Sequence, residues 1–323
     1  MKILFHENEL NYRGQSTALY DYAHFSEEFL GHQAVIIYNK TLPTNHPAGI
    51  EKFKKRFEVL EYSDPNEIDG FIRKGNFDLF YNIKNGNIDG IDTKECRSAV
   101  HTVFKYYEPH GDVYAYVSEW LSQVMTGGKA PFVPHMVNIP LSTYENLRSE
   151  LNIPQNAKVF GYYGGAASFN IKFAQEVVEK TARKYRDIFF IFMGVSPFVK
   201  KSWWRSLPKN IIFLPPSSDM LQKVKFINTC DALLHARERG ETFGITVAEF
   251  ALMGKPVITF AGAPEKAHIM ELGEEAYYYT DKRSLQEILL DADLTKNAAH
   301  RFKKFLPETV MKKFNEVFLR YNQ

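Results

Sequence analysis

Short apolar runs alternate with segments of helical spacing along this chain, and the whole series occurs twice. In the first half, runs of strand length cover residues 2–5, 34–38, 59–62, 79–83, 100–104 and 114–117. Segments with helical spacing lie between them at 17–30, 49–57, 65–74 and 118–125. Buried parallel strands appear as nearly continuous apolar runs, and strands that alternate with helices form doubly wound sheets. The pattern therefore predicts an α/β fold.

The second half restarts the series after a segment with several prolines. Strand patterns cover residues 158–163, 188–193, 211–214, 232–235 and 256–260, and helical patterns cover 170–184, 218–228, 244–253 and the part beyond 284. A chain of 323 residues exceeds what one hydrophobic core usually supports. We expect two Rossmann-like doubly wound domains facing a cleft, at 1–145 and 146–300. A helical tail at 301–323 is available to pack back on the N-terminal domain.

Composition excludes several classes of protein. The net charge is +2, with 40 basic and 38 acidic residues and no basic stripe, so nucleic-acid binding is not expected. Cys96 and Cys230 form no CxxC pair, which argues against a disulfide framework and a thiolate metal site. No apolar run approaches the length of a membrane span, and the N-terminus turns polar too early for a signal peptide. The expectation is a cytoplasmic protein, and a peripheral membrane contact is left open.

The sharpest local signal is the segment 241–249, which reads Glu-Thr-Phe-Gly-Ile-Thr-Val-Ala-Glu. Glu241 precedes a predicted helix, Gly244 marks the start of that helix, and Glu249 lies about one turn further along. Free backbone N–H groups and the helix dipole at such a start favour an anion, and a diphosphate suits the site. The alternative is that Glu241 only complements the helix dipole and that Glu249 is an exposed helix residue.

The surroundings of this segment carry a family resemblance. A strand at 231–237 leads into it, and Gly-Lys-Pro-Val-Ile at 254–258 follows it. The stretch 210–260 resembles the C-terminal signature of retaining GT-B glycosyltransferases, above all those of family 4, where Glu-x7-Glu precedes a strand of this type. It also resembles glycosyltransferase-like proteins of large DNA viruses. The resemblance implies a transferase of glycan biosynthesis that needs no metal or cofactor. Its donor would be a UDP- or GDP-sugar, and its acceptor a glycan, a lipid or a protein.

The resemblance also assigns roles within the C-terminal, nucleotide-sugar-binding domain. Glu241 would act at the donor sugar near the reacting centre, and Glu249 would bind the ribose. Thr242 and the amides around Phe243 and Gly244 would hold the diphosphate. The base would lie at the loop 214–220, against Met220 and the backbone near residue 213. Met220 can equally be a core residue.

The phosphate-binding cations show one departure from the family pattern. Lys172 matches the family lysine that binds donor phosphate, although an exposed lysine in the first turn of a helix is an equal reading. The family usually has an arginine five residues before that lysine, and here the position is Ala167. Either Arg237 or Arg239 supplies the missing charge, or the backbone carries more of the phosphate binding.

The N-terminal, acceptor-side domain contains a glycine loop and two candidate histidines. Arg13 and Gly14 lie between the first strand and the first helix, where the family's loop approaches the donor phosphate. The family also places a histidine after a central strand of this domain. His110 lies in a loop and is preferred as the catalytic histidine, whereas His101 lies in an apolar run typical of a core histidine.

Two other functions stay open at this point. The chain can be a non-catalytic nucleotide-sugar-binding protein, a reading supported by the alanine at position 167. It can also be a sugar-nucleotide epimerase or a phosphorylase of the GT-B fold. A nicotinamide dehydrogenase is disfavoured, because no G-x-G-x-x-G follows the first strand.

Overall fold

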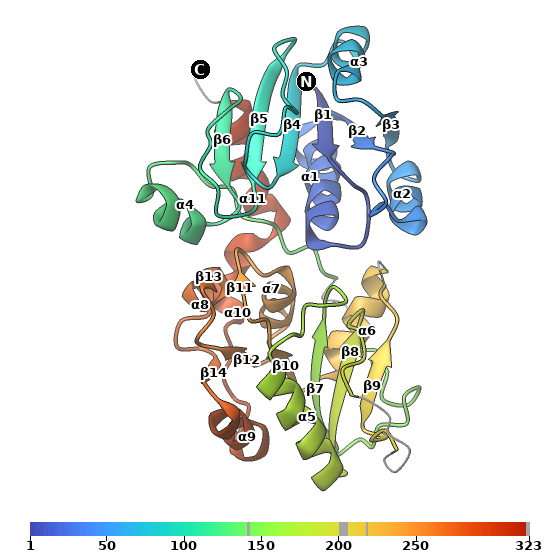
Figure 1. Cartoon of the computed structure of the whole chain (residues 1–323), viewed down its shortest axis with the longest axis vertical. Helices are drawn as coiled ribbons and strands as arrows, with labels where there is room; N and C mark the ends of the chain where they lie inside the picture. Colours follow the sequence, from blue (N-terminus) through green and yellow to red (C-terminus); the bar gives the residue numbers. More distant parts are fainter. Residues whose placement is uncertain (141–142, 200–205, 218, 321–323) are drawn as a thin grey trace. The chain divides into compact units, whose positions relative to one another are not determined.

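The computed structural model describes residues 1–140, 143–199, 206–217 and 219–320. The chain divides into two compact units, one of Met1–Met136 with Lys304–Gln323 and one of Val137–Lys303. Each unit contains a six-stranded sheet whose strands are parallel to their neighbours (Figure 1). The predicted α/β class, built on two parallel sheets with flanking helices, is confirmed.

The first unit is a doubly wound sheet with the strand order β3-β2-β1-β4-β5-β6. The strands are β1 (Lys2–Glu7), β2 (Gln33–Asn39), β3 (Glu58–Tyr62), β4 (Leu79–Lys84), β5 (Arg97–Thr102) and β6 (Val113–Tyr116). The helices between them are α1 (Gly14–Leu30), α2 (Pro47–Lys54), α3 (Glu67–Gly75) and α4 (Glu119–Thr126).

Both faces of this sheet are apolar, which explains why its strands read as continuous apolar runs. Ile3 and Phe5 of β1 belong to one buried cluster, with residues of α1, whereas Leu4 belongs to another, with Ile68 and Ile72 of α3. Side chains of a strand point alternately to its two faces, so α1 and α3 cover opposite sides. Since helices cover both faces of the sheet, the connecting loops lie at the ends of the strands.

The last residues of the chain complete the core of the first unit. Three successive segments, η1 (Lys303–Phe305), α11 (Pro307–Phe314) and η2 (Asn315–Leu319), end the described chain. Phe314 is fully buried, with its ring centroid 5.3 Å from those of Tyr22 and Tyr81 and 6.5 Å from that of Phe5. Aromatic clusters of this size contribute strongly to stability. The tail is therefore an integral part of the N-terminal core.

The second unit repeats the architecture with the strand order β14-β12-β10-β7-β8-β9. These strands are β7 (Lys158–Tyr163), β8 (Ile188–Met193), β9 (Ile211–Leu214), β10 (Ala232–His235), β12 (Val257–Phe260) and β14 (Tyr277–Tyr279). A separate two-stranded ladder joins β11 (Gly240–Glu241) to β13 (Glu265–Lys266).

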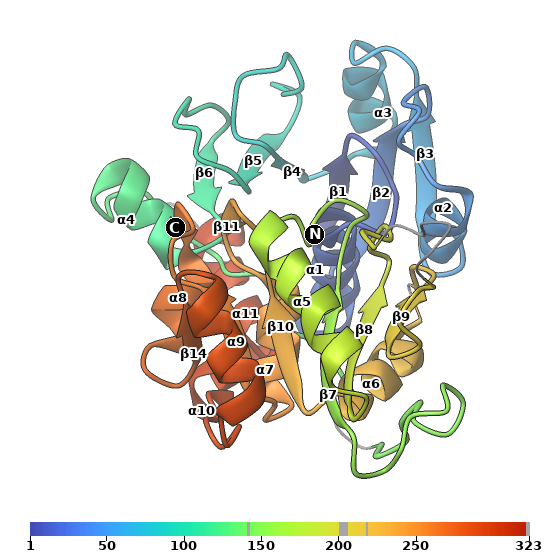
Figure 2. The ribbon, with the colours of Figure 1, turned by 60° about the horizontal axis from the view of Figure 1, so that its bottom comes forward.

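The helices of the second unit are α5 (Lys172–Lys184), α6 (Met220–Thr229), α7 (Ile245–Leu252), α8 (Ala267–Leu272), α9 (Lys282–Asp291) and α10 (Ala299–Phe302). Helices α5, α6, α7 and α9 contact the larger sheet of this unit, whereas α8 contacts β11 and α10 packs on α7 and α8. Helices α5 and α9 pack side by side (Figure 2), while α6 contacts β7 and α7 contacts β10 and β12. Within the part of the chain that the structure describes, no helix is both long and apolar enough to cross a membrane.

Candidate functional site

The segment that joins β10 to α7 turns sharply at Gly244. This residue is the N-cap of α7 and has a φ of 93°, a left-handed conformation that side chains disfavour. A Cβ at this position would also lie 3.1 Å from Cγ of Glu241 and 3.4 Å from Cβ of His268. The backbone conformation therefore favours glycine here, and any side chain would also crowd the Glu241 side chain. The turn brings the Glu241 side chain to the start of α7, where the first N–H groups have no partner within the helix.

The Glu241 carboxylate is held by two basic side chains. Nη1 of Arg237 lies 2.6 Å from Oε2, and Nε2 of His235 lies 3.3 Å from Oε1. Burial alone would raise the pKa of Glu241, but the hydrogen bond with His235 and the charge of Arg237 outweigh it and lower the pKa to about 2. Glu241 is therefore ionised at neutral pH, and 15% of its side chain remains exposed.

Glu249 is buried rather than exposed, so the reading of an exposed helix residue is wrong. Its side chain is 2% exposed, and Oε1 lies 3.3 Å from Nζ of Lys223 on α6. The same Nζ lies 5.5 Å from the centre of the Tyr163 ring at the end of β7. Charged groups are rarely buried without such a partner. Lys223 was missed by sequence reasoning, because 26 residues separate it from Glu249.

Hydrogen bonds join the loop before α5 to the residues that follow β10 and lead to Glu241. The backbone N–H groups of Asn170 and Ile171 donate to the Ala236 carbonyl oxygen at 3.0 and 3.3 Å. The N–H of Glu238 in turn donates to Oδ1 of Asn170 at 2.8 Å. These bonds fix the start of α5, whose first residue, Lys172, is exposed.

The two arginines beside the motif have different partners. Nε of Arg239 lies 2.7 Å from Oε1 of Glu265, which is 4% exposed in the β11–β13 ladder. Arg237 instead contacts Glu241 and keeps 32% of its side chain exposed. Ala167 is exposed in the loop before α5. Of the two arginines, Arg237 thus lies at Glu241.

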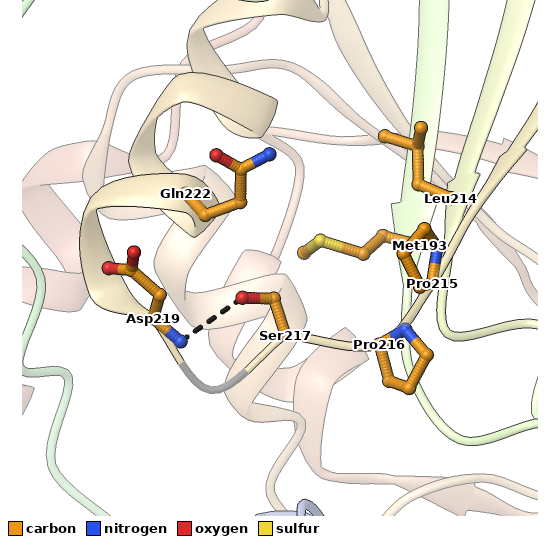
Figure 3. A pocket seen from close by; sticks show the side chains of 7 residues that line it. All are labelled: Met193, Leu214, Pro215, Pro216, Ser217, Asp219 and Gln222. Atoms are coloured by element: carbon orange, nitrogen blue, oxygen red, sulfur yellow. Dashed lines mark hydrogen bonds between the residues drawn. The ribbon is translucent and has the colours of Figure 1, made fainter.

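A pocket of about 360 Å³ lies at the carboxyl ends of β8 and β9, next to the start of α6 (Figure 3). Gln222 and Asp219 face Met193 and Leu214 across it. The N–H of Asp219 donates to Oγ of Ser217 at 3.1 Å, and Oδ1 of Asp219 accepts from the N–H of Leu221 at 2.9 Å. Met220, the first residue of α6, is not among the lining residues, which are Met193, Leu214, Pro215, Pro216, Ser217, Asp219 and Gln222.

In the first unit, the predicted glycine loop leads into α1. Gly14 is the first residue of this helix, and Arg13 is its N-cap without a side-chain capping bond. Nη1 of Arg13 lies 2.9 Å from Oε1 of Glu9, and 67% of the Arg13 side chain is exposed. The arginine is therefore accessible to a ligand of this unit.

The two candidate histidines differ in burial. His101 is fully buried, with Nδ1 2.5 Å from the Tyr81 hydroxyl and Nε2 2.8 Å from the Val133 carbonyl oxygen. Burial lowers the pKa of His101 to about 3, so it is a neutral, hydrogen-bonded core residue. His110 is less buried, and its Nε2 lies 3.1 Å from Nζ of Lys84. Because a lysine ammonium only donates, Nε2 of His110 accepts this bond.

Comparisons with known proteins agree with this architecture. A family model described as "Glycosyl transferases group 1" matches residues 143–305. No curated protein matches the sequence. Several solved structures share the fold at low identity.

Three of these structures have the GT-B architecture and match the chain over nearly its whole length. Alr3699/HepE from Anabaena, solved with UDP-glucose, has a TM-score of 0.73 and 15% identity over 98% of each chain. A glycosyltransferase from Rickettsia africae ESF-5 has a TM-score of 0.70 and 15% identity over 99% of each chain. WaaG, a glycosyltransferase involved in lipopolysaccharide biosynthesis, has a TM-score of 0.65 and 11% identity over 98% of this chain and 99% of its own.

Proposed function

The chain belongs to the glycosyl transferases group 1 family, and we propose that it transfers a sugar from a nucleoside diphosphate sugar to an acceptor with retention of configuration, as a GT-B enzyme of the family 4 type. The observation that carries this proposal is the ionised carboxylate of Glu241 at the start of α7, in contact with Arg237. The site combines a positive helix end, an arginine and one fixed carboxylate. This combination suits a sugar joined to a diphosphate.

The donor diphosphate would lie on the amides of Thr242, Phe243 and Gly244, with Arg237 and Lys172 beside it. Positive groups at this place stabilise the charge that develops as the bond between C1 of the sugar and the β-phosphate oxygen breaks. That oxygen keeps the bonding electron pair and takes up the acceptor's proton, while the acceptor oxygen bonds to C1 from the same face. The Glu241 carboxylate would stabilise the oxocarbenium-like transition state.

The nucleoside would occupy the second unit as well. The pocket at the ends of β8 and β9 offers the Gln222 carboxamide as both donor and acceptor for a base edge. Glu249 would accept hydrogen bonds from the ribose hydroxyls, with Lys223 as its counter-ion. We favour uridine as the nucleoside, since HepE, which has the same fold, was solved with UDP-glucose and with UDP.

The proposed roles of Arg13, Gly14 and His110 in the N-terminal unit stay predictions. Arg13 is accessible, which suits contact with a phosphate. Both ring nitrogens of His110 already have partners, Nε2 in Nζ of Lys84 and Nδ1 in the Glu108 carbonyl oxygen, so abstraction of a proton by His110 would require one of these contacts to break.

The full chain should be assayed for nucleoside diphosphate release from UDP-, GDP- and ADP-sugars, with and without candidate acceptors. We expect a UDP-sugar to be consumed and UDP to raise the melting temperature, because a ligand of the native state stabilises it. NMR of the product should show the anomeric configuration of the donor. Binding without turnover would indicate the non-catalytic alternative, and interconversion of sugar nucleotides without acceptor would indicate an epimerase.

A further inference from the structure

Three buried polar side chains next to Glu241 are joined to one another by hydrogen bonds, and none of them has a role in the proposed donor binding. Nδ1 of His235 lies 2.9 Å from Oγ1 of Thr259, and this Oγ1 lies 3.1 Å from Nε2 of His268. The three residues are at most 1% exposed. The side chains come from β10, β12 and α8, so they converge from three separate elements.

The pairing of β10 with β12 fixes the contact between His235 and Thr259. His235 and Thr259 are register partners in the parallel pair β10–β12. The carbonyl oxygen of His235 accepts from the Tyr279 hydroxyl at 3.0 Å, which also ties β10 to β14. The imidazole rings of His235 and His268 lie 4.8 Å apart. Neither ring can turn without disturbing its neighbours.

The direction of each hydrogen bond follows from the chemistry of its ends. A carboxylate only accepts, so Nε2–H of His235 donates to Oε1 of Glu241. In a neutral His235, Nδ1 is then an acceptor and receives the Thr259 hydroxyl proton. That hydroxyl has no second proton, so its oxygen accepts from Nε2–H of His268. Nδ1 of His268 is left as a lone pair, and it has no hydrogen-bond partner among the described residues.

We propose that His235, Thr259 and His268 form a one-directional hydrogen-bond relay that positions Glu241, with the carboxylate setting its direction and the Thr259 hydroxyl joining its two imidazoles. The proposal builds on the role proposed above for Glu241. Without the Thr259 hydroxyl, Nδ1 of His235 loses its donor, and the imidazole that donates to Glu241 is held by a hydrogen bond at Nε2 alone. The imidazole ring is then less fixed, and Arg237 is left as the contact that holds the carboxylate in one position.

The relay acts through Glu241, which distinguishes it from simple packing. Thr259→Val keeps the shape and removes the hydroxyl, and it should lower kcat about tenfold, a loss typical of one hydrogen bond. Thr259→Ser restores the hydroxyl and should recover most of the rate. Affinity for UDP, which has no sugar to meet Glu241, should stay unchanged. In a Glu241→Gln background, Thr259→Val should cost little more, because residues that act as a unit are not additive.

A readout that does not depend on activity separates the relay from the proposed function. In histidine 15N spectra of the full chain, His235 and His268 should both appear as neutral Nε2–H tautomers, with assignment from His268→Gln. Thr259→Val should move the Nδ1 resonance of His235. The opposite tautomer in the wild-type chain would overturn the relay, and so would full additivity of Thr259→Val with Glu241→Gln. Correct tautomers with no transferase activity on any donor would overturn the proposed function alone.

Discussion

Nη1 of Arg237 lies 2.6 Å from Oε2 of Glu241, four residues further along the chain. Arg237 is a cation suited to binding phosphate, and its partner Glu241 is the carboxylate that we propose to face the sugar. Since 32% of the Arg237 side chain remains exposed, its other N–H groups can bind a ligand without breaking this contact. One ion pair thus serves both halves of the proposed donor.

Replacing Glu241 by Gln removes the negative charge and keeps the shape. We expect kcat to fall on the order of 100-fold, the size of effect seen when one transition-state contact is lost. UDP binding, measured by calorimetry, should be unchanged. Glu238→Gln makes the same chemical change at an exposed position nearby and should leave turnover intact. Normal turnover in Glu241→Gln would remove its assigned role.

Arg237→Gln should lower kcat/KM for the donor on the order of 100-fold, because the leaving diphosphate loses a positive partner. Steady-state kinetics with a UDP-sugar measure this change. Arg186→Gln removes the same charge from an exposed position and provides the control. If Arg237→Gln and Arg186→Gln have the same kcat/KM, the backbone amides at the start of α7 bind the diphosphate without help from Arg237. Arg237 then does not replace the arginine that the family has at the position of Ala167.

Gln222→Ala tests the base pocket. We expect UDP affinity to fall about tenfold, because one bidentate contact to the base edge is lost. Inhibition by pyrophosphate, which has no base, should not change. Gln286→Ala makes the same substitution on α9 and should leave UDP binding as it is. Equal losses for UDP and pyrophosphate would place the base elsewhere.

Phe314→Ala should destabilise the N-terminal unit by about 3 to 5 kcal/mol, the range for a large aromatic removed from a core. The ring is fully buried among Phe5, Tyr22 and Tyr81. Urea unfolding followed by circular dichroism measures the change. Phe29, which is 45% exposed, gives the matched control, and Phe29→Ala should cost much less. Equal losses would show that the tail is not part of this core.

Burial makes His101 a source of acid sensitivity. Its pKa is about 3 in the folded chain against an ordinary value of about 6.5 for histidine, so the unfolded chain binds more protons between these values. Stability therefore falls as pH decreases through this window, by up to about 1.4 kcal/mol per pH unit for one histidine. His101→Gln should flatten the curve of unfolding free energy against pH by this amount. His300→Gln, at an exposed position, should leave the slope unchanged, and parallel curves for all three proteins would contradict the assignment.

The strands of the second sheet show what local pattern can predict. Residues 158–163, 188–193, 211–214 and 232–235 were predicted with the bounds that the structure has, because buried parallel strands are continuous apolar runs. Strand β14 was missed, since three tyrosines at Tyr277–Tyr279 are too short a run to stand out. The six-residue helix α8 was missed for the same reason.

The site was predictable only where its residues are close in sequence. The segment 241–249 could be recognised from the sequence alone, because its glycine and its two carboxylates lie in one turn and in the helix that follows it. Lys223 at Glu249 and Thr259 at His235 are joined by packing and by strand register. No spacing rule reveals such pairs. The two histidines could be distinguished by their sequence context, since His101 lies in an apolar run and His110 in a loop, and the full burial of His101 agrees with that prediction.

The return of α11 to the first unit has a consequence for biosynthesis. The ribosome synthesises a chain from its N-terminus, and domains generally fold as units during synthesis. Residues 137–303 form the whole second unit, which can fold once they have emerged. The N-terminal unit must wait, because Phe314 and Phe318 are the last pieces of its interior. In this protein the unit that is made first cannot complete its core until the residues that follow the second unit have been made.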